Sequence, residues 1–196
     1  NGVGVVPATK TLNGDGVTPA NLTILSVDPY DFGQIATGST TVQVFTIQYT
    51  GSVDATAIGG VFTDGTHYQF EGGAYPGTTG TCGDPINANC TIALEFKPVL
   101  NGIHADTFTI QWDDGTGTLV TDDLGVTGEG LAPAVLTFNP NTTYDFGNQA
   151  TGSSTVTTFN VVYTGAVAAT MNVPGSTFGT GTYRFEGGAY PGLTGS

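Results

Sequence analysis

Apolar and polar residues alternate along several short segments of this chain. In residues 44–49, Phe45, Ile47 and Tyr49 fall on one face, and polar residues or valine fall on the other. A period of two is that of a strand with one buried face. The same pattern marks further segments at residues 22–24, 68–70, 92–97, 107–112 and 124–126.

The alternation predicts a core on one face of these strands. No apolar pattern at helical spacing extends beyond about one turn, and residues 71–81, rich in Gly, Thr and Pro, predict a loop. Short strands separated by Gly-rich turns are typical of an all-β sandwich. The predicted inward set is Leu22, Phe45, Ile47, Tyr49, Leu94, Phe96, Phe108, Ile110 and Trp112.

A long stretch occurs twice. Residues 30–39 recur as residues 144–153, 114 positions later, and residues 70–77 recur as 185–192, 115 positions later. A repeat of this length predicts tandem domains. Each has roughly the 100 residues of an immunoglobulin-type sandwich.

The repeat divides the chain into three parts. We expect residues 1–18 to be the closing strand of a preceding repeat, 19–133 a complete immunoglobulin-like domain, and 134–196 a partial second one. The partial domain would be completed either by a longer array or by strand exchange between copies, with Val3–Val6 as a short donor strand. The longer array is the preferred interpretation, because repeats normally number at least three.

The net charge of −13 limits the partners. Only Lys10, Lys97 and Arg184 are basic. No basic patch for a nucleic acid or an anionic membrane surface can be built from them. No apolar run is long enough to span a bilayer, and no signal peptide is visible, which favours a mature or partial chain.

Several short stretches together match a known pattern. They are residues 30–33 with 37–39, 45–47 with 50–51, 82–83 with 90–92, 96–98 and 126–130. In these stretches the sequence resembles the bacterial immunoglobulin-like repeats of the HYDIN/ASH type in "choice-of-anchor" surface proteins. The resemblance covers residues 19–133 and the front of 134–196. It implies tandem repeats in large secreted or surface-anchored proteins, and so an extracellular or cell-surface location.

Cys82 and Cys90 flank a seven-residue loop. Two cysteines in a Lys-poor, Thr- and Gly-rich chain suggest an oxidising compartment and a disulfide. Such a bond would contribute about 2.5 kcal/mol on the chain-entropy model. A zinc site needs about four ligands, and His67 and His104 have no motif spacing.

Acidic residues occur in loose pairs, such as Asp113 with Asp114. Asp15 and Glu129 fall at the expected domain junctions, where calcium could stiffen an array. The preferred interpretation is that these are solvated turn carboxylates, so that no cofactor or metal site is assigned.

No motif for a nucleophile elbow, a metalloprotease or a phosphate loop is present, so we expect no catalytic residues and no enzyme. The expected function is structural: a stalk, fibre, filament or adhesin whose partners are neighbouring repeats or copies of itself. The alternative is a module binding a surface glycan or protein, with Tyr75 and Tyr190 of the repeated loop stacking on a sugar.

Overall fold

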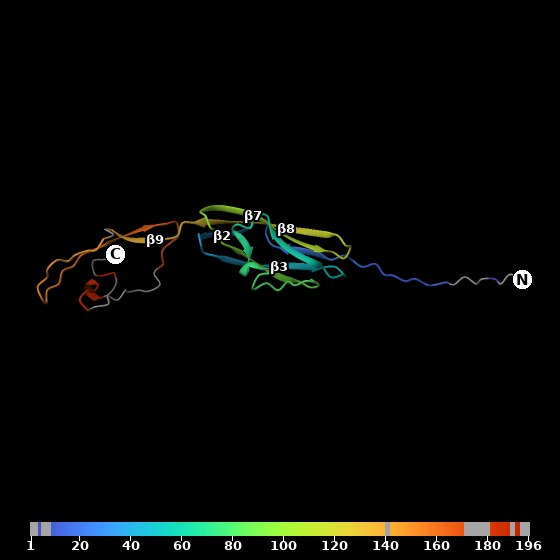
Figure 1. Ribbon diagram of the computed structural model, residues 1–196, viewed down its shortest axis with the longest axis horizontal. Helices are drawn as coiled ribbons and strands as arrows, with labels where there is room; N and C mark the ends of the chain where they lie inside the picture. Colours follow the sequence, from blue (N-terminus) through green and yellow to red (C-terminus); the bar gives the residue numbers. More distant parts are fainter. Residues whose placement is uncertain (1–3, 5–8, 140–141, 171–180, 189–190, 193–196) are drawn as a thin grey trace.

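The computed structural model describes residues 4, 9–139, 142–170, 181–188 and 191–192. Strands dominate this part of the chain, with two short 3-10 turns (Figure 1). The elements are β1 (Asn21–Leu25), β2 (Tyr30–Ala36), β3 (Thr41–Thr50), β4 (Thr56–Phe62), β5 (Tyr68–Phe70), η1 (Glu71–Gly73), β6 (Cys90–Phe96), β7 (Gly102–Asp113), β8 (Leu119–Leu131), β9 (Val135–Asn139), β10 (Asn160–Thr164) and η2 (Glu186–Gly188).

Two four-stranded sheets form a sandwich. One has the order β1-β3-β6-β5 and the other β2-β8-β7-β4. Figure 1 shows β7 and β8 in one layer and β3 in the other. Numbered from β1, omitting β2, the sheets are ABED and CFG, the immunoglobulin order. Strand β2 extends the second sheet by pairing with β8 in parallel.

The core lies between the two sheets, as the alternation predicts. Eight of the nine residues expected to face inward are at most 2% exposed, and Tyr49 is half-buried against the same cluster. The Tyr49 hydroxyl donates to the Val53 carbonyl at 2.7 Å, which accounts for its position at the rim. The single tryptophan, Trp112, donates from Nε1 to the Ala20 carbonyl at 3.1 Å.

Polar contacts connect the two sheets at their edges. The Ile24 amide of β1 donates to Asp122 Oδ2 of β8 at 2.8 Å. The Tyr68 hydroxyl of β5 donates to the His104 carbonyl of β7 at 2.8 Å, and burial raises the pKa of this phenol. These two partly buried donors therefore find their acceptors across the sandwich.

Strands β9 and β10 repeat the pairing of β1 with β3. Val135 lies opposite Thr164, 114 positions beyond the pair Asn21 and Thr50. All residues of β9 and β10 are exposed, including those that correspond to core residues of the first sandwich.

Residues 9–18 contain no strand and are exposed. The predicted closing strand over residues 1–18 thus falls partly on residues outside the described chain and partly on a segment without regular structure. Its pairing stays a prediction, because its partner strands would belong to a preceding repeat.

Candidate functional site

A disulfide closes the loop before β6. Cys82 and Cys90 are bonded, with their Cα atoms 4.9 Å apart, which confirms the prediction from composition. Cys82 is buried at 4% exposure and Cys90 is the first residue of β6. The middle of the loop is also anchored, since Ala55 and Ile86 exchange two backbone hydrogen bonds of 2.9 Å.

The loop that precedes the disulfide lies along the edge of β6. The Ala93 amide donates to the Pro76 carbonyl at 2.8 Å, and the Thr81 and Cys82 amides both donate to the Thr91 carbonyl. These bonds continue the edge of the sheet where β5 ends. Ala93 is therefore fully buried, although the alternation along β6 predicted an outward position.

Gly77 allows this close approach. Its φ is +95°, and a Cβ at this position would lie 2.5 Å from the Ala93 carbonyl oxygen. Only glycine combines a positive φ with so little space. The loop is braced further by Glu71, whose Oε2 accepts from the Thr79 amide at 2.7 Å and from its hydroxyl at 2.6 Å.

Tyr75 packs from this loop against the core cluster. Its ring is half-buried and meets Phe70 edge-on, with centroids 5.5 Å apart. Its hydroxyl is buried without a hydrogen-bond partner among the described residues. Burial, with a smaller contribution from Asp84, raises the pKa of Tyr75 to about 12.

The sugar contact assigned to Tyr75 stays a prediction. Because the hydroxyl is buried, a bound sugar would meet only the part of the ring that remains exposed. Tyr190, the corresponding residue of the second repeat, lies outside the described residues. The preceding turn nevertheless recurs: Gly187 has φ 74° and ψ 1°, against φ 73° and ψ 6° at Gly72.

The disulfide loop lines a shallow depression of about 280 Å³. Amide side chains offer donors and acceptors there, although Asn89 Oδ1 already accepts from the Tyr49 amide at 2.9 Å. No residue pattern in the sequence marks this depression. It is lined by Thr81, Gly83, Pro85, Ile86, Asn87, Ala88, Asn89 and Cys90.

Two histidines without a sequence motif form a stacked pair at one end of the sandwich. The ring centroids of His67 and His104 are 3.6 Å apart with an interplanar angle of 21°. His67 Nδ1 accepts from the Val99 amide at 3.2 Å, and His104 Nε2 lies 2.8 Å from the Leu100 carbonyl oxygen. The pair therefore holds the turn between β6 and β7.

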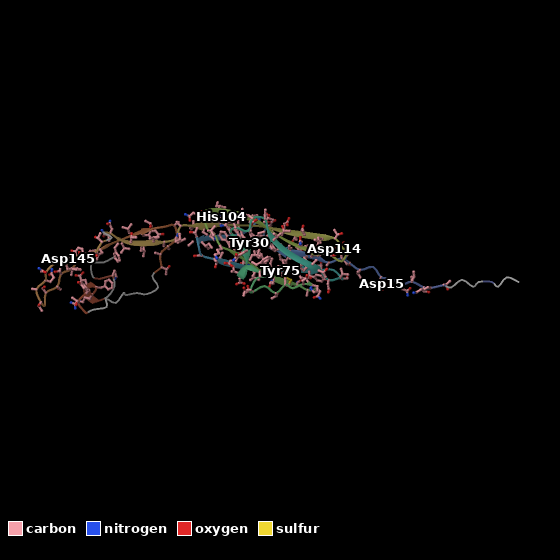
Figure 2. The ribbon with its side chains drawn as sticks, viewed as in Figure 1. Asp15, Tyr30, Tyr75, His104, Asp114 and Asp145 are labelled. Atoms are coloured by element: carbon pink, nitrogen blue, oxygen red, sulfur yellow. A yellow bond between two sulfur atoms is a disulfide. The ribbon has the colours of Figure 1, made fainter. Side chains whose placement is uncertain are left out.

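The pKa of His67 lies below its ordinary value. Burial is the largest cause, repulsion by His104 adds to it, and Asp64 opposes both. The neutral ring is also the form whose Nδ1 can accept a hydrogen bond from Val99. Figure 2 places His104 at the end of the sandwich nearer to β9 and Asp114 at the opposite end.

Carboxylates act mainly as acceptors for nearby amides. Asp113 Oδ1 accepts from Gly115, and Asp28 Oδ1 accepts from Gly125 across the sheet edge. The Thr116 hydroxyl and amide bond to Asp114, and these bonds lower the pKa of that carboxyl. These carboxylates therefore hold turns and a sheet edge by accepting hydrogen bonds, in addition to carrying negative charge.

The predicted calcium positions lie apart from any ligand cluster. Glu129 Oε2 accepts from Gln34 Nε2 at 2.6 Å, and Asp15 lies on the exposed segment outside the sandwich (Figure 2). Within the described residues, no three His, Cys, Asp or Glu side chains gather in a metal-binding arrangement. Calcium at a junction stays an untested expectation.

Comparison with known proteins identifies no family. No family model and no curated protein matches the chain. A solved ASH/PapD-like domain of human CEP192 aligns at a TM-score of 0.39 and 11% identity, covering 68% of this chain and 99% of that domain.

A second alignment is to a family 123 glycoside hydrolase from Clostridium perfringens, described as hydrolysing glycolipid glycans. Its TM-score is 0.38 and its identity 11%, and it covers 59% of this chain and 28% of that enzyme. Neither likeness assigns an activity.

In the described part of the chain, no helix has the length and apolar character to cross a membrane. The strand order, the buried core and the disulfide are therefore what characterise this protein: it contains an all-β sandwich of immunoglobulin-like topology.

Proposed function

We propose that the chain is a structural segment of an extracellular repeat protein, in which tandem immunoglobulin-like units form a stalk, fibre or adhesin. The observation that carries the proposal is the repeated backbone. Strands β9 and β10 pair in the register of β1 and β3, shifted by 114 residues. Units repeated at this spacing suit a spacer, because each unit has its own core and adds its own length to the array.

Two features of the first sandwich support an extracellular spacer. The disulfide belongs to an oxidising compartment. In addition, the fully buried residues of the described sandwich are apolar or aromatic, as in a domain whose interior serves packing.

Among the described residues, no second sheet covers the exposed face of β9 and β10. In the first sandwich the corresponding face of β1 and β3 is covered by the second sheet. A longer array supplies such strands from the same chain, and strand exchange supplies them from another copy. Peptide mapping of native material separates the two: further copies of the Tyr-Asp-Phe-Gly stretch support the array, and their absence supports exchange.

Electron microscopy of the native particle tests the structural role. We expect a beaded rod or filament with units of one sandwich each. A compact particle without repeating units would contradict the proposal.

A binding module is the second proposal, favoured by the depression beside the disulfide and by the partly exposed Tyr75, six positions before its first lining residue, Thr81. A glycan array probed with the parent protein, Tyr75→Phe and Tyr75→Ala tests it. Stacking on a sugar predicts that the phenylalanine variant binds and the alanine variant does not. Absence of any glycan signal from the parent contradicts this role for the loop.

A further inference from the structure

The connection between β8 and β9 is short and bonded on both sides. β8 ends at Leu131 and β9 begins at Val135, so three residues join them and the ends lie within about 14 Å. The Leu131 carbonyl accepts from the Thr37 amide of the first unit, and the next carbonyl, Ala132, accepts from the Ala166 amide after β10, each at 2.9 Å. Consecutive residues are thus attached to different units.

An apolar group lies at the end of the first sandwich beside this connection. Val99, Leu100 and Ile103 are 55%, 65% and 76% exposed. The Leu100 carbonyl oxygen lies so close to Gly130 of β8 that a Cβ there would be 2.3 Å away. The turn that presents these side chains is therefore packed against the last residues of β8.

This turn is held in place before any partner arrives. His67 and His104 bind its backbone at Val99 and Leu100. The Pro98 carbonyl accepts from the Gly38 amide at 3.0 Å, and the Pro98 side chain is buried. A rigid apolar surface loses little conformational entropy when another surface covers it.

The turn after β10 has the matching character. In the first unit the turn after β3 carries Ser52 and Asp54, and in the second unit alanines stand at the corresponding positions 166 and 168. The second turn is the one bonded to Ala132, two residues after Gly130, which the Leu100 carbonyl approaches closely. Alanine thus takes the place of a polar and a charged residue in the turn that is bonded to the connection.

We propose that Val99, Leu100 and Ile103 form an apolar seat for the turn at residues 165–169 of the following unit, which makes the junction a fixed joint rather than a flexible linker. The inference rests on the proposed function and deepens it, since it names the surface through which neighbouring units stack. Covering this seat removes apolar area from water, the main driving force for such contacts.

Spin labels at equivalent positions of the two units test the joint. Gln48→Cys and Val162→Cys, both exposed and 114 positions apart, are labelled in the full chain, where the native cysteines are paired. Double electron–electron resonance then gives the distribution of distances between the labels. We expect one narrow distribution in this background.

Leu100→Asp with Ile103→Asp is expected to broaden that distribution at least twofold. The matched control is Val44→Asp with Val61→Asp, at residues that are 42% and 59% exposed and lie on β3 and β4 rather than on the turn between β6 and β7. It adds the same charge and should keep the distribution narrow. A broad distribution in the background, or a narrow one in the seat variant, would overturn the inference.

Failure of the proposed joint and failure of the proposed function give different results. A narrow distribution that depends on the seat, together with a compact native particle, would support the joint and refute the stalk. A beaded native particle with a broad distribution would support the array and refute the seat.

Discussion

At the scale of single residues, the core tolerates no charge and the edge loop tolerates little volume. Ile47 is fully buried in the middle of β3, between β1 and β6. Gly77 lies against the backbone of Ala93 with a positive φ. For each of these two positions, the chain offers a second position at which the same substitution meets solvent or open space. The effect of each substitution on stability can therefore be measured against a matched control.

Ile47→Asp is expected to lower the free energy of unfolding by several kcal/mol, because it buries an unpaired carboxylate. Val44→Asp, on the exposed face of the same strand, should change it by about 0.5 kcal/mol or less. Urea denaturation followed by Trp112 fluorescence measures both. Equal midpoints for the two variants would show that the register of β3 is wrong.

Gly77→Ala is expected to destabilise the sandwich by about 1–3 kcal/mol, since alanine would need a strained φ and would collide with Ala93. Gly83→Ala is the control, because a Cβ at Gly83 meets nothing within 4 Å. Chemical denaturation of both variants measures the difference. If the two behave alike, the loop does not pack along β6 as described.

At the scale of elements, turns are fixed by side chains distant in sequence. The turn between β6 and β7 is held by His67, from before β5, and by His104, from β7. The hydrogen bond that His67 Nδ1 accepts from the Val99 amide exists only while the His67 ring is neutral. The stability of this end of the sandwich therefore depends on pH.

The lowered pKa of His67 sets the direction of that dependence. The unfolded chain takes up a proton near the ordinary value of 6.5, before the folded chain does. Stability is thus fully present above about pH 6.5 and falls as the pH drops from there to the lower folded value. Thermal melts between pH 8 and pH 4.5 measure this loss.

His67→Gln is the control for that prediction, since it keeps a side-chain acceptor for the Val99 amide and does not titrate. We expect the fall in melting temperature just below pH 6.5 to be smaller in this variant. The further fall at lower pH, which comes from protonation of carboxylates, should remain. An identical pH profile in variant and parent would assign the dependence to other groups.

At the scale of the whole molecule, the two units differ in what covers their first two strands. Val161 of β10 corresponds to Ile47 of β3, yet it is 53% exposed. Tryptophan fluorescence reports the first unit alone, because Trp112 is the only tryptophan. Unfolding followed by Trp112 fluorescence therefore tests whether the first unit is stable independently of the second.

Val161→Asp is expected to leave the Trp112 unfolding midpoint almost unchanged, in contrast to Ile47→Asp, because Val161 is 53% exposed and Ile47 is fully buried in the core around Trp112. Urea titrations of the two variants under one condition give the comparison. A shift at Val161→Asp as large as that at Ile47→Asp would mean that the two units unfold together.

Particular elements show where prediction from the sequence reached its limit. The alternation located β3, β6, β7 and their inward residues, because each strand has one buried face. It missed β2 and β4, since Gly33 interrupts the first and Gly59 with Gly60 the second. Gly60 is required there because Phe70 and Phe108 fill the space that its Cβ would occupy.

The sequence by itself determined the class of fold, the repeat and the cysteine pairing, because periodicity, internal copies and two cysteines are local or countable properties. Only the tertiary structure decided that Ala93 is buried beneath a loop, that two histidines stack, and that an apolar turn lies beside the connection to β9. These features join residues tens of positions apart. Their spacing is set by how the two sheets pack, which no pattern along the chain records.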